Sequence, residues 1–295
     1  MYSLHDALGN PEEIVVRAKE LGYDAIALTD HHNLYGAIDF YEAAIKNGIK
    51  PILGVEVSVA PHLHTDKRAG IDHRVSHLTL LAETNEGYQN LLKLVSTSYL
   101  DGFYYTARVD KVLLRQYAKG LIALSGCAKG EIPRACHSND LERAEVLLKE
   151  FQSIFGMENF FLELVYHPES PTQISINQNL LLLAEQTHAP LVATKDAHYL
   201  HTDDREAQDV LLCIHDGKQL DDHHRTSMAF QDMSLSTPEE MIQAFKNTPS
   251  AVAHAREIAD RCHVSLKLKT NLLPTFHVET NETPERYLRR LCEQG

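Results

Sequence analysis

Short, wholly apolar segments alternate with helix-like segments up to about residue 202, and this alternation most limits what the chain can fold into. Runs such as Ala25–Leu28 and Leu121–Leu124 are apolar on both faces, which is typical of strands that are covered on both sides of a parallel sheet. In the segments between these runs, apolar residues recur at the spacing of an amphipathic helix. The alternation predicts an α/β fold, either a barrel or a wound parallel sheet. The expected strands cover residues 25–28, 51–59, 78–81, 121–124, 160–164 and 190–194.

The strand signal fades after about residue 203, and helical patterns replace it. The clearest helix start is Thr237-Pro238-Glu239-Glu240, a capping box with proline at the first helical position. Another helix starts at Thr283, and the chain stops inside it at Gly295, so the end resembles a cut. We therefore expect two regions, an α/β domain over residues 1–202 and a helical C-terminal extension over residues 203–295.

Composition limits the function classes. The 295 residues suffice for one barrel-sized domain, and the net charge of −13 argues against a surface that grips nucleic-acid phosphates unaided. The five cysteines show no CxxC spacing, which favours reduced thiols and a cytoplasmic protein. We find neither a signal peptide nor an apolar run long enough to cross a membrane. Eighteen histidines are many for this length and are a first indication of metal binding.

Polar residues follow most of the predicted strands at the point where each strand ends. Asp30 and His31 follow the first strand, Glu56 lies late in the second, Cys127 follows the strand at 121–124, and His167 follows the strand at 160–164. The last strand is followed by Asp196 and His198. Each residue alone is weak support for a site. Together they predict one, because parallel strands bring their carboxyl ends to the same edge.

Carboxylates gathered at one edge would repel each other, and bound cations are the usual remedy. Mixed histidine and carboxylate ligands suit Zn²⁺, Mn²⁺ or Fe²⁺ better than Ca²⁺. Two or three such ions a few ångströms apart can clamp a phosphate and generate hydroxide. The residues therefore indicate a site for divalent metal ions and phosphoester chemistry.

Several motifs occur in a fixed order along the chain. They are Tyr2-Ser3-Leu4-His5-Asp6, Ala27-Leu28-Thr29-Asp30-His31-His32-Asn33, the run from Gly48 to Glu56, the run from Gly120 to Cys127, and the run from Val192 to Leu200. In this order they resemble the PHP (polymerase and histidinol phosphatase) domain of bacterial DNA polymerase III alpha subunits. The linking segments Gly87-Tyr88-Gln89-Asn90-Leu91 and Cys213-Ile214-His215-Asp216-Gly217 also match, so the resemblance covers essentially the whole chain.

The resemblance implies a distorted barrel of about seven βα units that holds up to three metals. It implies that Asp6, His31 and His198 share one metal, and that Glu56, His77 and Cys127 share another. Glu56 and Asp196 would also serve a third ion, together with two histidines of an H-x-H motif. The implied catalytic residues are Asp6, His31, Glu56, Asp196 and His198. The implied metal ligands are Asp6, His31, Glu56, His77, Cys127, Asp196 and His198.

One feature of the family's pattern is absent from this sequence. In the family the H-x-H motif lies just before the Tyr-Ser-Leu segment, whereas here the chain begins at Met1-Tyr2. Either the start was assigned too late, the chain was trimmed, or this copy has lost a metal. We therefore expect a missing first strand, two usable metal positions and an impaired third. His32 stands where the family usually has glycine. Asp30 is expected to orient or cap a ligand.

Three functions are consistent with these motifs. The first is a metal-dependent phosphoesterase or 3′–5′ exonuclease module of a replicative polymerase. The second is a non-catalytic module that stabilises the polymerase and docks a separate proofreading subunit. The third is a free-standing histidinol-phosphate phosphatase, which the polymerase-like linkers disfavour. The expected partners are DNA, reached through the full-length polymerase, and other polymerase III subunits. The polymerase reaction itself would require residues beyond 295.

Overall fold

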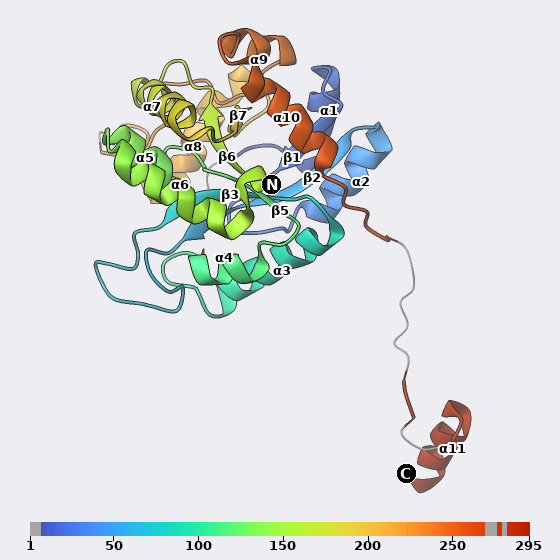
Figure 1. Ribbon diagram of the computed structural model, residues 1–295. Helices are drawn as coiled ribbons and strands as arrows, with labels where there is room; N and C mark the ends of the chain where they lie inside the picture. The colour runs from blue at the N-terminus through green and yellow to red at the C-terminus, as the bar shows by residue number, and fades with distance from the viewer. Residues whose placement is uncertain (1–6, 223, 269–275, 279–281) are drawn as a thin grey trace. The chain divides into compact units, whose positions relative to one another are not determined.

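The computed structural model describes residues 7–222, 224–268, 276–278 and 282–295. The chain divides into two units, Met1–Val264 and Ser265–Gly295. The first unit contains a seven-stranded sheet. Figure 1 shows helices packed around this sheet. The predicted α/β class is therefore confirmed. The described part of the second unit includes the helix α11 (Pro284–Gln294), whose N-cap is Thr283.

The sheet is mixed and curled, and its strands run in the order β1-β2-β3-β5-β6-β7, with the short β4 beside β2. The pairs β1–β2, β2–β4, β5–β6 and β6–β7 are parallel, whereas β3 is antiparallel to both of its neighbours. The strands are β1 (Ala25–Leu28), β2 (Lys50–Val59), β3 (Ser76–Ala82), β4 (Arg108–Val109), β5 (Leu121–Leu124), β6 (Phe160–Val165) and β7 (Leu191–Thr194).

The reversed direction of β3 has a direct consequence for the edge of the sheet. An antiparallel strand begins where its parallel neighbours end. The pairing of Ser58 with His77 places the first residues of β3 beside the last residues of β2. The amino end of β3 therefore lies at the same edge as the carboxyl ends of β2 and β5.

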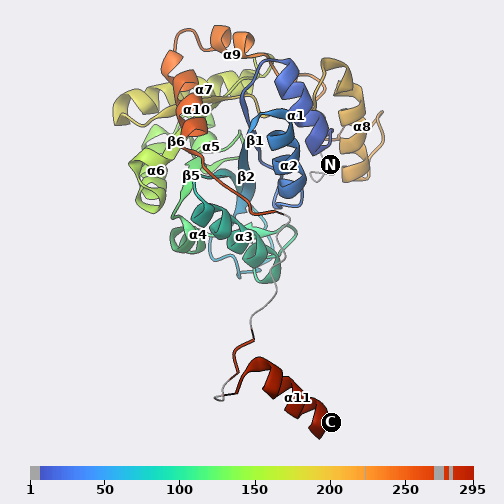
Figure 2. The ribbon, with the colours of Figure 1, turned by 90° about the vertical axis from the view of Figure 1, so that its right-hand side faces the viewer.

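Helices pack around the sheet, and Figure 2 shows α1 and α2 on one side of it and α5, α6 and α7 on the other. Sequence signals start several of them: a capping box between Asn10 and Glu13 begins α1, and Thr84 caps α3. No described helix combines the length and apolar character that crossing a bilayer requires. The helices of this unit are α1 (Pro11–Glu20), α2 (Ala37–Asn47), α3 (Asn85–Leu100), α4 (Lys111–Tyr117), α5 (Glu131–His137), α6 (Leu141–Phe155), α7 (Pro171–Thr187), α8 (Arg205–Asp216), α9 (Pro238–Ala244) and α10 (Pro249–Arg261), with short 3₁₀ turns at Met157–Asn159 and Thr202–Asp204.

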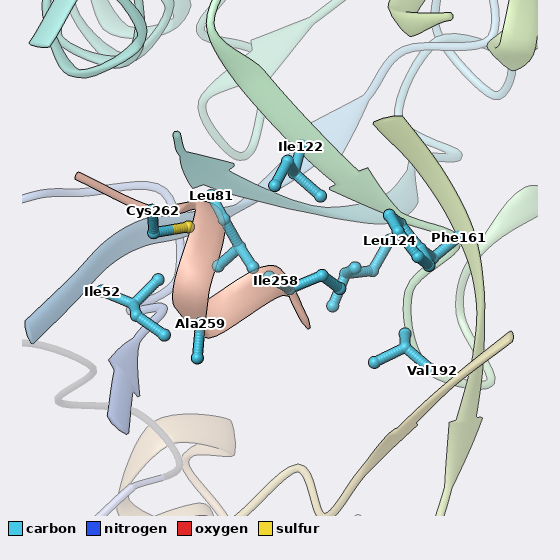
Figure 3. Close-up of a cluster of buried hydrophobic side chains, with 9 residues drawn as sticks. All are labelled: Ile52, Leu81, Ile122, Leu124, Phe161, Val192, Ile258, Ala259 and Cys262. Carbon is cyan, nitrogen blue, oxygen red and sulfur yellow. The ribbon is translucent and has the colours of Figure 1, made fainter. Parts of the chain in front are cut away.

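Helix α10 packs its apolar side against the interior side chains of the strands, as Figure 3 shows. Ile258 is 3% exposed and lies among side chains from several strands. Although α10 falls in the region expected to be an extension, it completes the core of the first unit. The buried cluster consists of Ile52, Leu81, Ile122, Leu124, Phe161, Val192, Ile258, Ala259 and Cys262.

The expected strands all occur, with ends that differ by at most two residues. The short elements β4, α4 and α5 were not predicted, because two to seven residues are too few to show a periodic pattern. In the part of the chain that the structure describes, no ladder joins β1 to β7. The closed barrel and the missing first strand therefore stay predictions, as does the boundary at residue 202.

Ile258→Ala should destabilise the first unit by about 2–5 kcal/mol, because it leaves a cavity beneath the sheet. Urea unfolding followed by circular dichroism measures this loss. Ile242→Ala on α9 is the matched control, since Ile242 is 58% exposed and its truncation should cost less than about 0.5 kcal/mol. Equal losses in the two variants would show that α10 does not close the core.

Candidate metal centre

The end of β1 and the middle of β2 hold the first two predicted ligands side by side. The backbone of His31 bridges to Glu56, the Glu56 N–H donates to the Asp30 carbonyl, and the His32 N–H donates to the Glu56 carbonyl. Both residues therefore stand on paired backbone. Asp30 accepts the Glu56 N–H with its backbone carbonyl oxygen. Asp30 also lines the cavity beside the predicted ligands.

Two imidazoles converge on one buried carboxylate oxygen. The Oε1 of Glu56 lies 2.8 Å from His31 Nδ1 and 2.5 Å from His77 Nδ1, and Glu56 is 6% exposed. A carboxylate oxygen and an unprotonated imidazole nitrogen repel each other at this distance, so a proton or a cation must lie between them. The donor atoms of these residues lie within 4.8 Å of one another, which suits one metal ion.

Burial and hydrogen bonding oppose each other at Glu56. Burial alone would raise the pKa of this carboxyl group, but the side chains of His31 and His77 offset burial and hold the pKa well below its usual range. Glu56 is therefore ionised at neutral pH. A buried anion that faces two nitrogen donors provides what a divalent cation requires.

Cys127 joins this group from the end of β5. Its Sγ lies 3.5 Å from His77 Nδ1. The approach depends on Gly126, which has φ +83°, and a Cβ at Gly126 would meet the His77 carbonyl oxygen at 2.7 Å. Burial and the neighbouring carboxylates of Glu56 and Asp196 raise the pKa of the Cys127 thiol well above its usual value. A bound cation would reverse this effect and favour the thiolate.

Asp196 and His198 reach the same cavity from the end of β7. His198 Nδ1 lies 2.9 Å from the Asp196 carbonyl, so Nδ1–H donates and Nε2 carries the lone pair that a metal would use. The ring centroids of His198 and His31 are 6.3 Å apart. A cavity of about 330 Å³ is lined by His31, Glu56, Cys127, Asp196 and His198, among others.

The structure thus brings together His31, Glu56, His77, Cys127, Asp196 and His198, while Asp6 lies outside the described residues. His31, Glu56 and His77 form the tightest group. Nitrogen, oxygen and sulfur donors around a buried anion fit a divalent metal ion. The ligand roles of the individual residues stay predictions.

Glu163 on β6 is a buried residue of this site that sequence analysis did not single out. Its Oε2 accepts the Gly126 N–H at 3.1 Å, and its Oε1 accepts the Thr194 hydroxyl at 2.8 Å. It therefore holds the loop with Cys127 and the loop with Asp196 at once. Burial and the charges of Asp196 and Glu56 raise its pKa to about 8. A single carboxylate inside the apolar run 160–165 was the signal available in the sequence.

Two further histidines, His167 and His32, differ from the predicted ligands in their surroundings and in their backbone conformation. His167 is buried, neither of its ring nitrogens has a hydrogen-bond partner within the described residues, and burial lowers its pKa to about 4. It is therefore neutral at pH 7. His32 has φ +60°, the left-handed region that favours glycine, which agrees with the glycine expected there. Its ring is 2.8 Å from Ser58 Oγ and 3.4 Å from Thr106 Oγ1.

The sequence also matches a known protein family. The model of the PHP domain matches residues 1–167, and the chain belongs to this family.

Among curated proteins, the chain is homologous to bacterial DNA polymerase III alpha subunits. It is 37% identical to the subunit of Treponema pallidum and 38% identical to that of Borreliella burgdorferi, in both cases over 100% of this chain. The alpha subunit of Thermus aquaticus is 38% identical, again over the whole chain. The chain spans about a quarter of the length of these relatives, 25%, 26% and 25% respectively.

Solved structures show weaker likeness. An amidohydrolase from Chromobacterium violaceum aligns with a TM-score of 0.42 and 16% identity, over 67% of this chain and 85% of its own. A candidate metal-dependent phosphoesterase from Bifidobacterium adolescentis aligns with a TM-score of 0.40 and 11% identity, over 82% and 93%. Neither TM-score reaches 0.5.

Glu163→Gln should change how stability depends on pH in the chelated, metal-free protein. The folded pKa of about 8 exceeds the ordinary value of 4.5, so between these pH values the folded state keeps a proton that the unfolded state has lost. Raising the pH therefore favours unfolding, by up to about 1.4 kcal/mol per pH unit in this window. Glutamine cannot titrate and removes this contribution.

Urea unfolding of both proteins from pH 5 to pH 8 tests the expectation. The difference in unfolding free energy between Glu163→Gln and the parent should grow in favour of the variant as the pH rises. Glu185→Gln, at an exposed position on α7, is the control and should run parallel to the parent. Parallel curves for Glu163→Gln as well would show that Glu163 titrates normally.

Proposed function

We propose that this chain is a metal-dependent phosphoesterase module of the 3′–5′ exonuclease type, and that it works as the PHP domain of a replicative DNA polymerase III alpha subunit. The observation that carries the proposal is the convergence of His31, His77 and Cys127 on the buried carboxylate of Glu56, beside Asp196 and His198. These nitrogen, oxygen and sulfur atoms are suited to bind a metal ion, whereas close packing does not require them.

Glu56, His77 and Cys127 would hold one cation, and His31 and His198 would hold a second with Asp6. Glu56 and Asp196 would also serve a third. When bound, Zn²⁺ or Mn²⁺, with Fe²⁺ as a further option, would supply positive charge for a phosphate and lower the pKa of water. Glu163 would keep the loops of Cys127 and Asp196 at a fixed separation. The phosphodiester would bind in the cavity of about 330 Å³ beside these residues, and neutral His167 adds no charge that would compete with a cation. Asp6 and a third ion belong to the same proposal.

The wider setting is also proposed. Residues 1–202 would form a distorted PHP barrel and residues 203–295 would lead towards the polymerase body, in a cytoplasmic protein. DNA would reach the site through the full-length polymerase, and polymerisation would belong to parts of the relatives beyond this chain. The other polymerase III subunits, including a proofreading subunit, are the proposed protein partners.

A second candidate is a non-catalytic module that stabilises the polymerase and docks other subunits, with metal used for folding. One observation favours it: among the described residues, only His31, Glu56 and His77 form a tight three-donor cluster. One cation held there would suffice for structure. The two candidates differ in whether Asp196 and His198 are needed for turnover.

The purified chain, loaded with Mn²⁺, should slowly shorten a 3′-labelled single-stranded oligonucleotide. His31→Ala and Asp196→Ala should each lower the rate at least about 100-fold, because each removes a proposed ligand. Gel analysis of the labelled products measures the rate, and elemental analysis of the same samples measures bound metal.

His62→Ala is the matched control, since this exposed histidine lies on the loop after β2 and should leave the rate unchanged. Metal-loaded parent protein without any turnover would favour the structural module. A rate that survives both ligand substitutions would contradict the proposed site.

A further inference from the structure

Several exposed aromatic side chains lie on segments close to the metal centre. We name Tyr35, Tyr99, Phe103 and Tyr105 the aromatic rim; their exposed fractions are 65%, 40%, 49% and 79%. Tyr99 and Phe103 stack with centroids 6.4 Å apart, and Tyr105 meets Tyr104 edge-on at 4.7 Å. Tyr35 is close enough to Tyr99 to add to the effect of burial in raising the pKa of Tyr99. Ring contacts thus join Tyr99 to Phe103 and Tyr104 to Tyr105, and residues 103–105 are consecutive in the chain.

The aromatic rim is tied to the metal centre at two points. Tyr35 follows His31 on the loop after β1, where the Tyr35 N–H donates to Asn33 Oδ1 at 3.1 Å. Thr106, next to Tyr105, lies 3.4 Å from His32, whose ring centroid is 5.9 Å from that of His31. A ligand that reached the cations from this side would pass the exposed rings.

A buried arginine makes the support of the rim rigid. Arg108 has no exposed surface, and its guanidinium donates only to backbone carbonyls at 2.6–2.9 Å. These bonds fasten the turn before Tyr104 to the long loop between β2 and β3. The accepting residues are Gly102, Asp72, His64 and Asp66.

Tyr105 is both strained and exposed. Its φ of +63° is uncommon for a bulky residue and costs on the order of 1–3 kcal/mol. The ring makes edge contacts with Tyr104 and His73 and otherwise projects outward. This backbone strain does not improve packing, because the Tyr105 ring stays exposed. An exposed ring held in this way is suited to bind a ligand.

Charge and ring chemistry together indicate the class of ligand. A chain of net charge −13 gains little from phosphates, so a nucleic acid must be held by another interaction. Bases stack on aromatic faces irrespective of sequence, at about 1–3 kcal/mol per base. Arg68 on the neighbouring loop adds little net charge, because it is paired with Asp72.

We propose that the aromatic rim is a stacking subsite for the unpaired bases of a single-stranded nucleic acid whose adjoining phosphodiester lies at the metal centre. The inference rests on the proposed function for its substrate class. The subsite binds through bases more than through phosphates. Its affinity therefore depends only weakly on salt.

The absence of tryptophan from the sequence allows a clean test. Tyr105→Trp and, separately, Tyr35→Trp each place a single tryptophan on the rim. With metal removed by a chelator, a short oligothymidylate should quench either tryptophan in a saturable way, because bases stack on the indole. Doubling the salt concentration should change the dissociation constant less than twofold. Val146→Trp, on the exposed side of α6, is the control and should not respond.

A second arm measures the substrate dependence of hydrolysis. Tyr105→Ala should raise KM for the oligonucleotide by roughly 5- to 150-fold, the equivalent of one stacked base, with kcat changed much less. Quenching in chelated protein needs no turnover, so quenching without hydrolysis supports the subsite even if the proposed enzyme activity fails. Absence of saturable quenching at both rim positions overturns the subsite, whether or not hydrolysis occurs, and would leave the rim as a surface for a protein partner.

Discussion

A carboxylate that is buried and ionised is costly unless positive charge or hydrogen-bond donors face it, and Glu56 is the residue where this constraint acts. The side chains of His31 and His77 meet its Oε1 from the strands on either side of β2. Glu56 Oε1 is therefore the point at which the side chains from this edge of the sheet meet. The loops of Cys127 and of Asp196 complete the enclosure, and Glu163 holds both loops through its two oxygens.

The direction of one strand explains what sequence analysis could and could not assign to the site. His31, Glu56, Cys127, Asp196 and His198 were predicted because residues at the carboxyl ends of parallel strands gather at one edge. His77 begins its strand, so this rule would have missed it, and only family resemblance named it. The antiparallel direction of β3 brings it to the same edge. No sequence pattern reveals the direction of a strand such as β3, which is buried along most of its length.

The fold shows the same division between local and long-range information. Caps, periodicity and glycines set the helices and strands, so the starts of α9 and α11 and the strand limits agreed with expectation. The packing of α10 into the core was not predicted, because it depends on contacts between residues far apart in sequence, such as Ile52 and Ile258. Glu163 was overlooked for a similar reason. Its partners lie on two other loops, and its pKa depends on burial that the sequence does not show.

Cobalt substitution tests most directly whether Glu56, His77 and Cys127 hold one cation. Titration of the metal-free protein with Co²⁺ should produce a thiolate-to-cobalt charge-transfer band in the near ultraviolet that saturates at one equivalent, because Cys127 becomes a thiolate ligand. The band should vanish in Cys127→Ser and survive in Cys136→Ser, whose thiol is buried elsewhere. A band that persists in Cys127→Ser, or no band in the parent protein, would contradict a metal centre at the end of β5.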